Sequence, residues 1–398
     1  MKNTKLIIGI AVGVVAVVAI VLAIALSGES HTHEFGEWDV AEKPTCSEKG
    51  TKVRYCSCGE KQTEAIVTLD HSFGDWATVK EPTVTEEGLK ERTCACGEKE
   101  TQKIDKRPVT YSKDLKFILN DDDQSYTVTG IGTCTDTDVF IPNTYEGLPV
   151  TSIGDRAFRE CTGFTSIVIP DSVTSIGDMA FERCTGLTSI VIPDSVTSIG
   201  RSAFSGCTGL TSITVDEDNT SYQSIDGNLY SKDGKTLIQY AIGKKNTSFT
   251  IPDSVTSIGY AAFGYCTGLT SIVIPDSVET IGEFAFAFCS NLSEITLGES
   301  LRAIGGDAFR GCTGLTSIVI PDSVETIGEH AFTDCSNLSV ITLGESLRAI
   351  GVRAFDGCTG LTDVYYIGTE AEGAKISIYP GNSYLQNATI HYNYVPAN

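Results

Sequence analysis

The chain of 398 residues carries a net charge of −22 and contains 14 cysteines but only 5 histidines. At about 150 residues per domain, this length predicts two or three domains. A surface this acidic repels phosphate backbones and anionic lipid headgroups, which argues against nucleic acid as a partner.

The first feature along the chain is an apolar segment at residues 6–26 that contains no charged side chain. As a helix it would span about 31 Å, which matches the hydrocarbon core of a bilayer. Lys2 and Lys5 precede it, so residues 1–5 are expected in the cytoplasm and the rest outside. A cleaved signal peptide is the alternative, because residues 23–25 resemble an A-x-A cleavage site, although its apolar region would normally be shorter. We predict a single-pass anchor in the cell membrane, with the bulk of the chain extracellular.

Two small modules follow, at residues 27–70 and 71–107, as copies offset by 38 residues. Segments of this size bury too little apolar surface to be stable without a disulfide, a metal or a neighbour. They resemble short His/Trp/Cys modules that precede repeat domains in bacterial surface proteins, which implies a spacer or wall-proximal role. The matched positions are His33 and His71, Trp38 and Trp76, Pro44 and Pro82, Gly50 and Gly88, and Cys56-x-Cys58 and Cys94-x-Cys96.

The first module offers a candidate set of structural zinc ligands in Cys46, Cys56, Cys58 and His71, since three thiolates and an imidazole suit a tetrahedral site. The second module has Val84 where the first has Cys46 and so lacks a complete set. The C-x-C spacing departs from the C-x2-C of common zinc sites. A disulfide from Cys46 to Cys56 or Cys58 is the alternative in an exported chain. No cofactor other than this zinc is predicted.

The remaining sequence is dominated by eight copies of G-x-x-A-F-x-x-C, most of them 23 residues apart. A fixed period of this length predicts a solenoid, in which each unit stacks on its neighbours to bury an apolar face. The copies end at Cys161, Cys184, Cys207, Cys266, Cys289, Cys312, Cys335 and Cys358.

Within each unit, L-T-S-I-V-I alternates with period two, which predicts a strand with one face inward. Pro and Asp end the strand, a second apolar pair follows, and A-F-x-x-C is long enough for one helical turn only. We therefore predict a β-rich repeat solenoid with one short strand and one short helical turn per coil, after a transmembrane helix and two cysteine-containing modules. The expected strand centres are Ile141, Ile169, Ile192, Val215, Ile251, Ile274, Leu297, Ile320, Leu343 and Tyr366.

The spacing of the repeats also divides this region. An N-terminal cap is expected at 108–153, the solenoid at 154–367 and a C-terminal cap at 368–398. An insertion near 216–248 contains NLYSKDGKTLIQY, which is typical of a hairpin around its Asp-Gly pair. The cap at 368–398 would cover an otherwise open edge.

The repeat cysteines are expected to form an interior column. At one per coil their Cβ atoms would lie about 4.8 Å apart, which is longer than the mean of about 3.8 Å in a disulfide. Free cysteine is also among the most buried residue types. We predict that these cysteines pack as small hydrophobic side chains.

This repeat closely resembles the leucine-rich repeats of BspA-like bacterial surface proteins, with their unit L-x-x-I-x-I-P-x-S-V-x-x-I-G-x-x-A-F-x-x-C. The resemblance covers about residues 126–367. Cys precedes the L-x-x-I segment here, as in Cys184-Thr185-Gly186-Leu187, whereas the general leucine-rich motif places Asn or Cys after it. The resemblance implies an exposed adhesin-like or binding protein.

Candidate contact residues are sought where the repeats vary. The outward strand positions are nearly uniform, whereas the positions around A-F vary and hold Tyr260, Tyr265, Phe284 and Phe288. Exposed aromatic side chains of this kind anchor protein or glycan contacts. The alternative is that they cover an interior edge or pack under the hairpin of the insertion.

The sequence does not predict an enzyme. Nucleophilic catalysis usually needs a histidine beside the nucleophile, and the solenoid region holds only His330 and His391. Two hypotheses remain: a membrane-tethered adhesin that binds proteins or glycans of a host or neighbouring cell, and a passive spacer in the cell envelope. The oligomeric state is not predicted.

Overall fold

A computed structural model describes residues 32–81, 87–105 and 110–395 of the chain. Within those residues no helix is long and apolar enough to cross a membrane, and the predicted anchor at 6–26 lies outside them. The chain divides into two compact units, residues 1–108 and 109–398, and each is described by itself.

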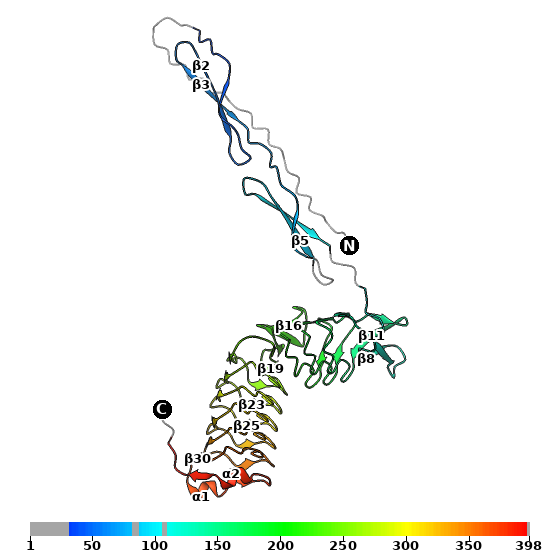
Figure 1. Cartoon of the computed structure of the whole chain (residues 1–398), viewed down its shortest axis with the longest axis vertical. Helices are drawn as coiled ribbons and strands as arrows, with labels where there is room; N and C mark the ends of the chain where they lie inside the picture. The colour runs from blue at the N-terminus through cyan, green and yellow to red at the C-terminus, as the bar shows by residue number, and fades with distance from the viewer. Residues whose placement is uncertain (1–31, 82–86, 106–109, 396–398) are drawn as a thin grey trace. The chain divides into compact units, whose positions relative to one another are not determined.

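The first unit contains two modules of the same design. Each is a three-stranded antiparallel sheet with its second strand in the centre (Figure 1). An isolated bridge joins Phe35 to Cys56 in one module and Phe73 to Cys94 in the other. The strands are β1 (Asp39–Glu42), β2 (Gly50–Tyr55) and β3 (Lys61–Ile66), then β4 (Ala77–Lys80), β5 (Gly88–Thr93) and β6 (Lys99–Ile104).

These modules have almost no hydrophobic core. Among their described residues, the buried apolar side chains are Val53, Cys56 and Cys94. Trp38 and Trp76 are half-buried, and each lies under an arginine of the central strand, at 4.5 and 4.7 Å from the guanidinium carbon to a ring centroid. So little buried surface leaves each sheet marginal alone.

The second unit is a β-solenoid, as predicted. Each of the ten expected strands is present, at or just before its expected centre. Strands of successive coils pair in parallel, except across the insertion and between residues 294–296 and 317–319. Between uninterrupted coils the register shifts by one repeat, so that Ile190 pairs with Ile213. The strands are β9 (Asp138–Phe140), β12 (Ser166–Val168), β14 (Ser189–Ile192), β16 (Ser212–Val215), β20 (Ser248–Thr250), β22 (Ser271–Val273), β24 (Glu294–Thr296), β26 (Ser317–Val319), β28 (Val340–Leu343) and β30 (Asp363–Tyr366).

A second ladder of parallel strands was not predicted. It forms where the second apolar pair of each repeat lies, and most of its strands are only two residues long, too short to show an alternating pattern. These strands are β11 (Leu148–Ile153), β13 (Ser175–Ile176), β15 (Ser198–Ile199), β21 (Ser257–Ile258), β23 (Thr280–Ile281), β25 (Ala303–Ile304), β27 (Thr326–Ile327), β29 (Ala349–Ile350) and β31 (Ser377–Ile378).

The predicted helical turn in each coil is wrong. In every copy of G-x-x-A-F-x-x-C, the second and fourth variable positions have positive φ, as at Phe284 and Phe288 with 57° and 62°. A left-handed residue cannot continue a right-handed helix. Instead, alternate N–H groups donate to the next coil, and the N–H of Phe286 lies 2.7 Å from the carbonyl oxygen of Ala308. The G-x-x-A-F-x-x-C segments of successive coils, called the turn side below, therefore form a third ladder of hydrogen bonds.

The phenylalanines of successive coils lie in file inside the solenoid, as the repeat predicted. Phe309 stacks on Phe286 with ring centroids 5.2 Å apart and planes 2° from parallel. The file is interrupted once, at the insertion, where Tyr240 takes the place of a phenylalanine and stacks on Phe263. Tyr240 is fully buried, like the phenylalanines of the file.

The insertion forms the predicted hairpin and also closes one part of the solenoid. Strands β18 (Asn228–Ser231) and β19 (Thr236–Gln239) pair antiparallel, with β17 (Tyr222–Ile225) beside β18, and β19 then pairs in parallel with β21. The Tyr222 hydroxyl accepts the backbone N–H of Ile199 at 2.9 Å, at the open edge of β15. In Figure 1 the solenoid changes direction here, between β16 and β19.

Both ends of the solenoid carry additional elements. At the amino end, β7 (Lys116–Leu119), β8 (Tyr126–Gly130) and β10 (Thr144–Tyr145) extend the sheet of β11. At the carboxyl end the sequence loses the repeat, yet β31 and β32 (Thr389–His391) each add one more parallel strand. Two short helices, α1 (Glu370–Gly373) and α2 (Ser383–Asn387), complete that end.

Candidate functional sites

Seven of the eight repeat cysteines are buried free thiols, as predicted, and Cys161, in the first copy, is half-buried. In six of the eight copies the thiol donates to the phenylalanine carbonyl oxygen of the preceding coil, at 2.9–3.2 Å. Burial raises the pKa of Cys289, Cys312 and Cys335 well above the ordinary value. A buried thiol with a raised pKa is a poor nucleophile, so these cysteines serve the fold.

We expect Cys312→Ala to lower the free energy of unfolding by about 1–2 kcal/mol, because it removes a buried hydrogen bond and leaves a small cavity. Denaturant unfolding would measure the loss. Cys161→Ala is the matched control, since the Cys161 thiol is half-buried and lies 3.8 Å from the Arg159 carbonyl oxygen. If Cys312 of the native protein reacted with a thiol reagent as fast as exposed Cys58, its assignment as a buried structural residue would be wrong.

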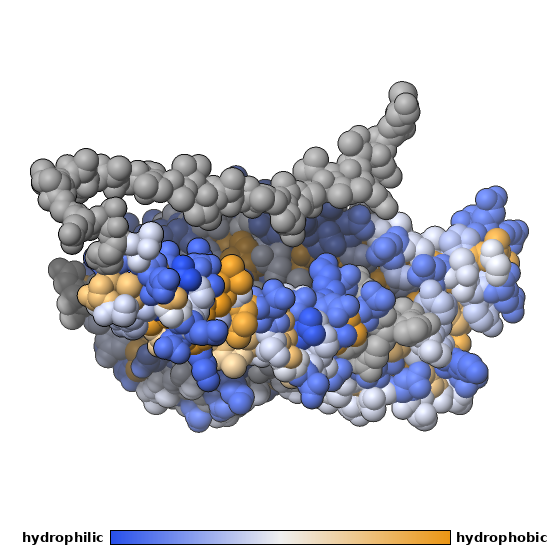
Figure 2. Space-filling model, turned by 90° about the horizontal axis from the view of Figure 1, so that it is seen from above, coloured by the Kyte–Doolittle hydropathy of each residue, from blue (hydrophilic) through white to orange (hydrophobic). Residues whose placement is uncertain are grey.

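The residue just before each of these strands has a structural role. Threonines and serines at this position donate their hydroxyls to the backbone of the preceding coil, as Thr188 Oγ1, next to β14, does to the Thr165 carbonyl oxygen at 3.1 Å. Thr211 and Thr270 repeat this bond. The exposed side chains of the strands are small, as at Ser189 and Val191. Figure 2 shows one view of the molecule, in which the surface is largely hydrophilic and hydrophobic residues are scattered in small groups.

The four predicted contact aromatics form two pairs on the turn side. Tyr265 stacks on Phe288 at 4.8 Å between ring centroids, and Tyr260 lies 5.4 Å from Phe284. All four are half-buried. The structure thus brings them together pairwise, each pair from neighbouring coils.

Arginines from before the insertion cover two of these rings. The guanidinium carbon of Arg183 lies 4.9 Å from the Tyr265 ring centroid, and that of Arg201 lies 5.4 Å from the Tyr260 centroid. Cation–π contacts of this kind contribute about 0.5–1 kcal/mol each at exposed sites. The tyrosines therefore also connect the two segments of the solenoid on either side of the insertion, a contact that the sequence did not predict.

An open cavity of about 560 Å³ also lies at the insertion, lined in part by Tyr240, Lys244, Lys245 and Phe249. The Lys244 ammonium donates to Asn228 Oδ1 at 2.9 Å and to the Asp226 carbonyl oxygen. Burial lowers its pKa. Sequence analysis missed this site, because its lining depends on how the hairpin folds back on the solenoid.

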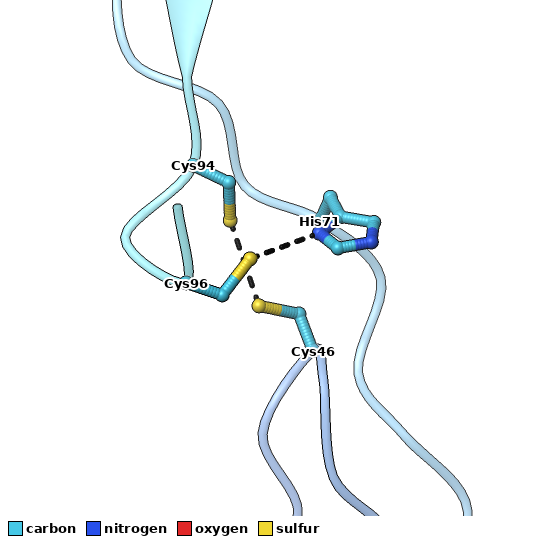
Figure 3. A group of neighbouring side chains, drawn as sticks. All are labelled: Cys46, His71, Cys94 and Cys96. Carbon is cyan, nitrogen blue, oxygen red and sulfur yellow. Dashed lines mark hydrogen bonds between the residues drawn. The ribbon is translucent and has the colours of Figure 1, made fainter. Parts of the chain in front are cut away.

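Potential metal ligands in the first unit form two groups, and the grouping differs from the predicted one. Cys46 and His71 lie with Cys94 and Cys96 (Figure 3), whereas Cys56 and Cys58 lie with His33. In each group the donor atoms are within 4.8 Å of one another. The 38-residue offset aligns His33 with His71. It therefore contained the signal that each C-x-C turn lies beside the histidine of its own module.

Hydrogen bonds in the two C-x-C turns favour the thiolate form. The backbone N–H of Cys96 lowers the pKa of the Cys94 thiol to about 6, and that of Cys58 does the same for Cys56. The opposite holds at Cys46, whose pKa is raised to about 12, mainly by its hydrogen bond with Cys96. Hydrogen bonds to Cys94 and Cys96 raise the pKa of His71.

The two histidines of the solenoid have structural partners. His330 Nδ1 lies 3.1 Å from Thr333 Oγ1, and that hydroxyl donates to the Arg353 carbonyl oxygen at 2.8 Å. His391 Nε2 lies 2.8 Å from Asp363 Oδ1, and the imidazole stacks on Tyr365.

Parallel ladders with a 23-residue period and an inward file of phenylalanines define the second unit as a leucine-rich-repeat solenoid. The family model described as the BspA type leucine rich repeat region matches residues 134–237 and 235–362, in six copies. The chain belongs to this family. The matched model describes a repeat region, and no enzymatic family is indicated.

Solved structures with the same fold include a leucine rich cell surface protein from Faecalibacterium prausnitzii, 27% identical with a TM-score of 0.51. That match covers 69% of this chain and 98% of the other. The pneumococcal vaccine antigen PcpA is 19% identical with a TM-score of 0.54, over 80% of this chain and 99% of its own, and shows the fold alone. No curated protein matches the chain.

Proposed function

We propose that this protein is an adhesin-like surface protein, anchored in the cell membrane by residues 6–26, whose solenoid binds a protein or glycan of a host or neighbouring cell. The observation that carries the proposal is the solenoid itself, which is similar to a solved leucine rich cell surface protein. The apolar segment at 6–26 supports export and anchoring.

The turn side is the better candidate for the binding surface. The exposed residues of the strands repeat from coil to coil, and the threonine hydroxyls just before the strands are engaged by neighbouring backbone. The turn side varies instead, and it carries the Tyr265–Phe288 stack. Half-buried aromatic side chains supply contact area at a low cost in conformational entropy.

The full-length chain in detergent, tested against immobilised matrix proteins and glycans, would distinguish an adhesin from a spacer. We expect saturable binding at submicromolar concentration to at least one member of the panel. A passive envelope spacer would be retained by none. Protease digestion of intact cells tests the location separately, since an extracellular solenoid is accessible from outside.

We expect Phe288→Ser combined with Tyr265→Ser to lower the affinity for a verified partner about tenfold or more, as truncation of aromatic anchors does. Val273→Ser with Val319→Ser is the matched control, since both valines are exposed on the strand side. Equal affinities of the two double variants would contradict the assignment of the turn side as the binding surface. Because Tyr265 also contacts Arg183 across the insertion, the affinities are compared at a temperature at which both double variants remain folded.

A further inference from the structure

The group Cys46, His71, Cys94 and Cys96 joins the two modules of the first unit. Cys46 lies between β1 and β2 of the first module, His71 precedes β4, and Cys94 and Cys96 lie in the turn between β5 and β6. We propose that these four residues bind one Zn²⁺, which ties the first module to the second.

The donor atoms are arranged as such a site requires. Three thiols and one imidazole form a Cys3His set, which binds structural zinc tetrahedrally. Zn–S bonds of about 2.3 Å place two sulfur ligands about 3.8 Å apart. The Sγ atoms of Cys46 and Cys94 are 3.5 Å apart, and Cys96 Sγ lies 3.3 Å from His71 Nδ1. In Figure 3 the three sulfurs and this nitrogen point toward one another, so small movements would admit the ion.

The turn that presents two of the ligands is held independently of any metal. The Cys94 N–H donates to the Glu98 carbonyl oxygen at 2.8 Å, and Gly97 N–H donates back to the Cys94 carbonyl oxygen at 2.9 Å. Gly97 has φ of 95°, which suits this tight turn. The bridge between Phe73 and Cys94 places the segment after His71 beside the turn.

A metal would also supply stability that the modules otherwise lack. Their buried apolar side chains are few, and domains of this size usually need a metal, a disulfide or a partner. Zinc that binds the folded form alone contributes its binding free energy to folding. A shared ion would stabilise both modules and restrict their relative movement.

The repeat of the modules explains why the structure groups these residues differently from the predicted set. His33, Cys56 and Cys58 are the counterparts of His71, Cys94 and Cys96, and they also converge, with His33 Nδ1 3.1 Å from Cys58 Sγ. The described part of the chain adds no fourth ligand to this first group. A cysteine in the loop after the first strand thus completes the site of the following module rather than its own.

The second module is consistent with this rule. The solenoid, rather than a third module, follows it, and Val84 occupies the position equivalent to Cys46, although that residue lies outside the described ones. The rule also accounts for the odd number of five cysteines in this region: two in each C-x-C turn and one in the loop after the first strand of the first module. A scheme in which every cysteine is paired in disulfides cannot do so.

The test uses the full-length chain purified in detergent under reducing conditions, with ZnCl2 as the only metal. We expect one tightly held zinc per chain after desalting. Cys96→Ser is expected to weaken zinc binding by about 100-fold or more, because it removes a ligand. Cys58→Ser, the same substitution at the equivalent position of the first module, is the matched control and should retain the ion.

Cobalt(II) gives a second measurement that does not depend on folding assays. Tetrahedral Co²⁺ with thiolate ligands absorbs visible light, and this absorption should be present in the parent chain and in Cys58→Ser but absent in Cys46→Ser. Equal zinc retention by Cys58→Ser and Cys96→Ser would overturn the proposal. So would a disulfide between Cys46 and Cys94, found by peptide mapping of protein isolated without reductant.

Discussion

Phe309→Ala is expected to lower the free energy of unfolding by about 3–5 kcal/mol, the range measured when a buried phenylalanine is truncated in a packed core. The Phe309 side chain is fully buried. Its ring stacks on Phe286 and on Phe332, with centroids 5.2 Å away on either side. Removal therefore takes a packing partner from both neighbouring coils, and the ladders hold the coils too firmly for the cavity to collapse.

Denaturant unfolding followed by circular dichroism would measure this loss. Val319→Ala is the matched control, because Val319 belongs to the same coil but is 56% exposed on the strand side. Its expected effect is within about 0.5 kcal/mol. A cost below about 1 kcal/mol for Phe309→Ala would show that the file of rings is not part of a tightly packed interior.

Gly351→Ala is expected to destabilise the solenoid by about 1–3 kcal/mol or more, through overpacking rather than a cavity. An ideal Cβ on Gly351 would lie 2.5 Å from Glu329 N, 2.6 Å from the Gly328 carbonyl carbon and 2.8 Å from Glu329 Cα. All three atoms belong to the backbone of the preceding coil, so no side chain can rotate away. The coils would have to separate locally.

Gly163→Ala offers a control with the opposite sign. A Cβ on Gly163 meets no atom within 4 Å, and its φ is not in the left-handed region. Alanine there reduces the entropy of the unfolded chain, which stabilises a protein by about 0.4–1 kcal/mol. Thermal unfolding of both variants would show the contrast, and similar shifts would contradict a close approach of coils at Gly351.

The solenoid could be predicted because two periods agree in its sequence. The 23-residue repeat set the coil, and the alternation in L-T-S-I-V-I set the strand and its inward face. The 23-residue repeat also predicted that the Ala, Phe and Cys of A-F-x-x-C point inward in every coil. Fully buried Phe309 and Cys312 confirm it.

The conformation of the turn side could not be predicted, because most residues that adopt positive φ there are of types that do not indicate it. Non-glycine residues adopt positive φ at a cost of about 1–2 kcal/mol each, and Phe284 and Arg353 are unusual occupants. Glycine at 206, 311 and 357 was the only local signal. The conformation is supported by hydrogen bonds between coils, which local propensity does not include.

The candidate zinc ligands illustrate a different limit. The residue types were recognised, but Cys46 and Cys94 are 48 positions apart and belong to different modules. Sequence copies align each residue with its counterpart, not with its neighbour in space. Only the folded first unit shows which cysteine lies beside which histidine.

The constant register of the ladders has a consequence for how this molecule changes in evolution. Residues 266–282 and 312–328 are identical, and each coil contacts mainly the coils before and after it, as in other solenoids. Unequal recombination between such segments would insert or delete 46 residues, two complete coils, without creating a new kind of contact. Each event would alter the reach of the protein by about 10 Å, so variation in length among strains is the expected genetic record of this architecture.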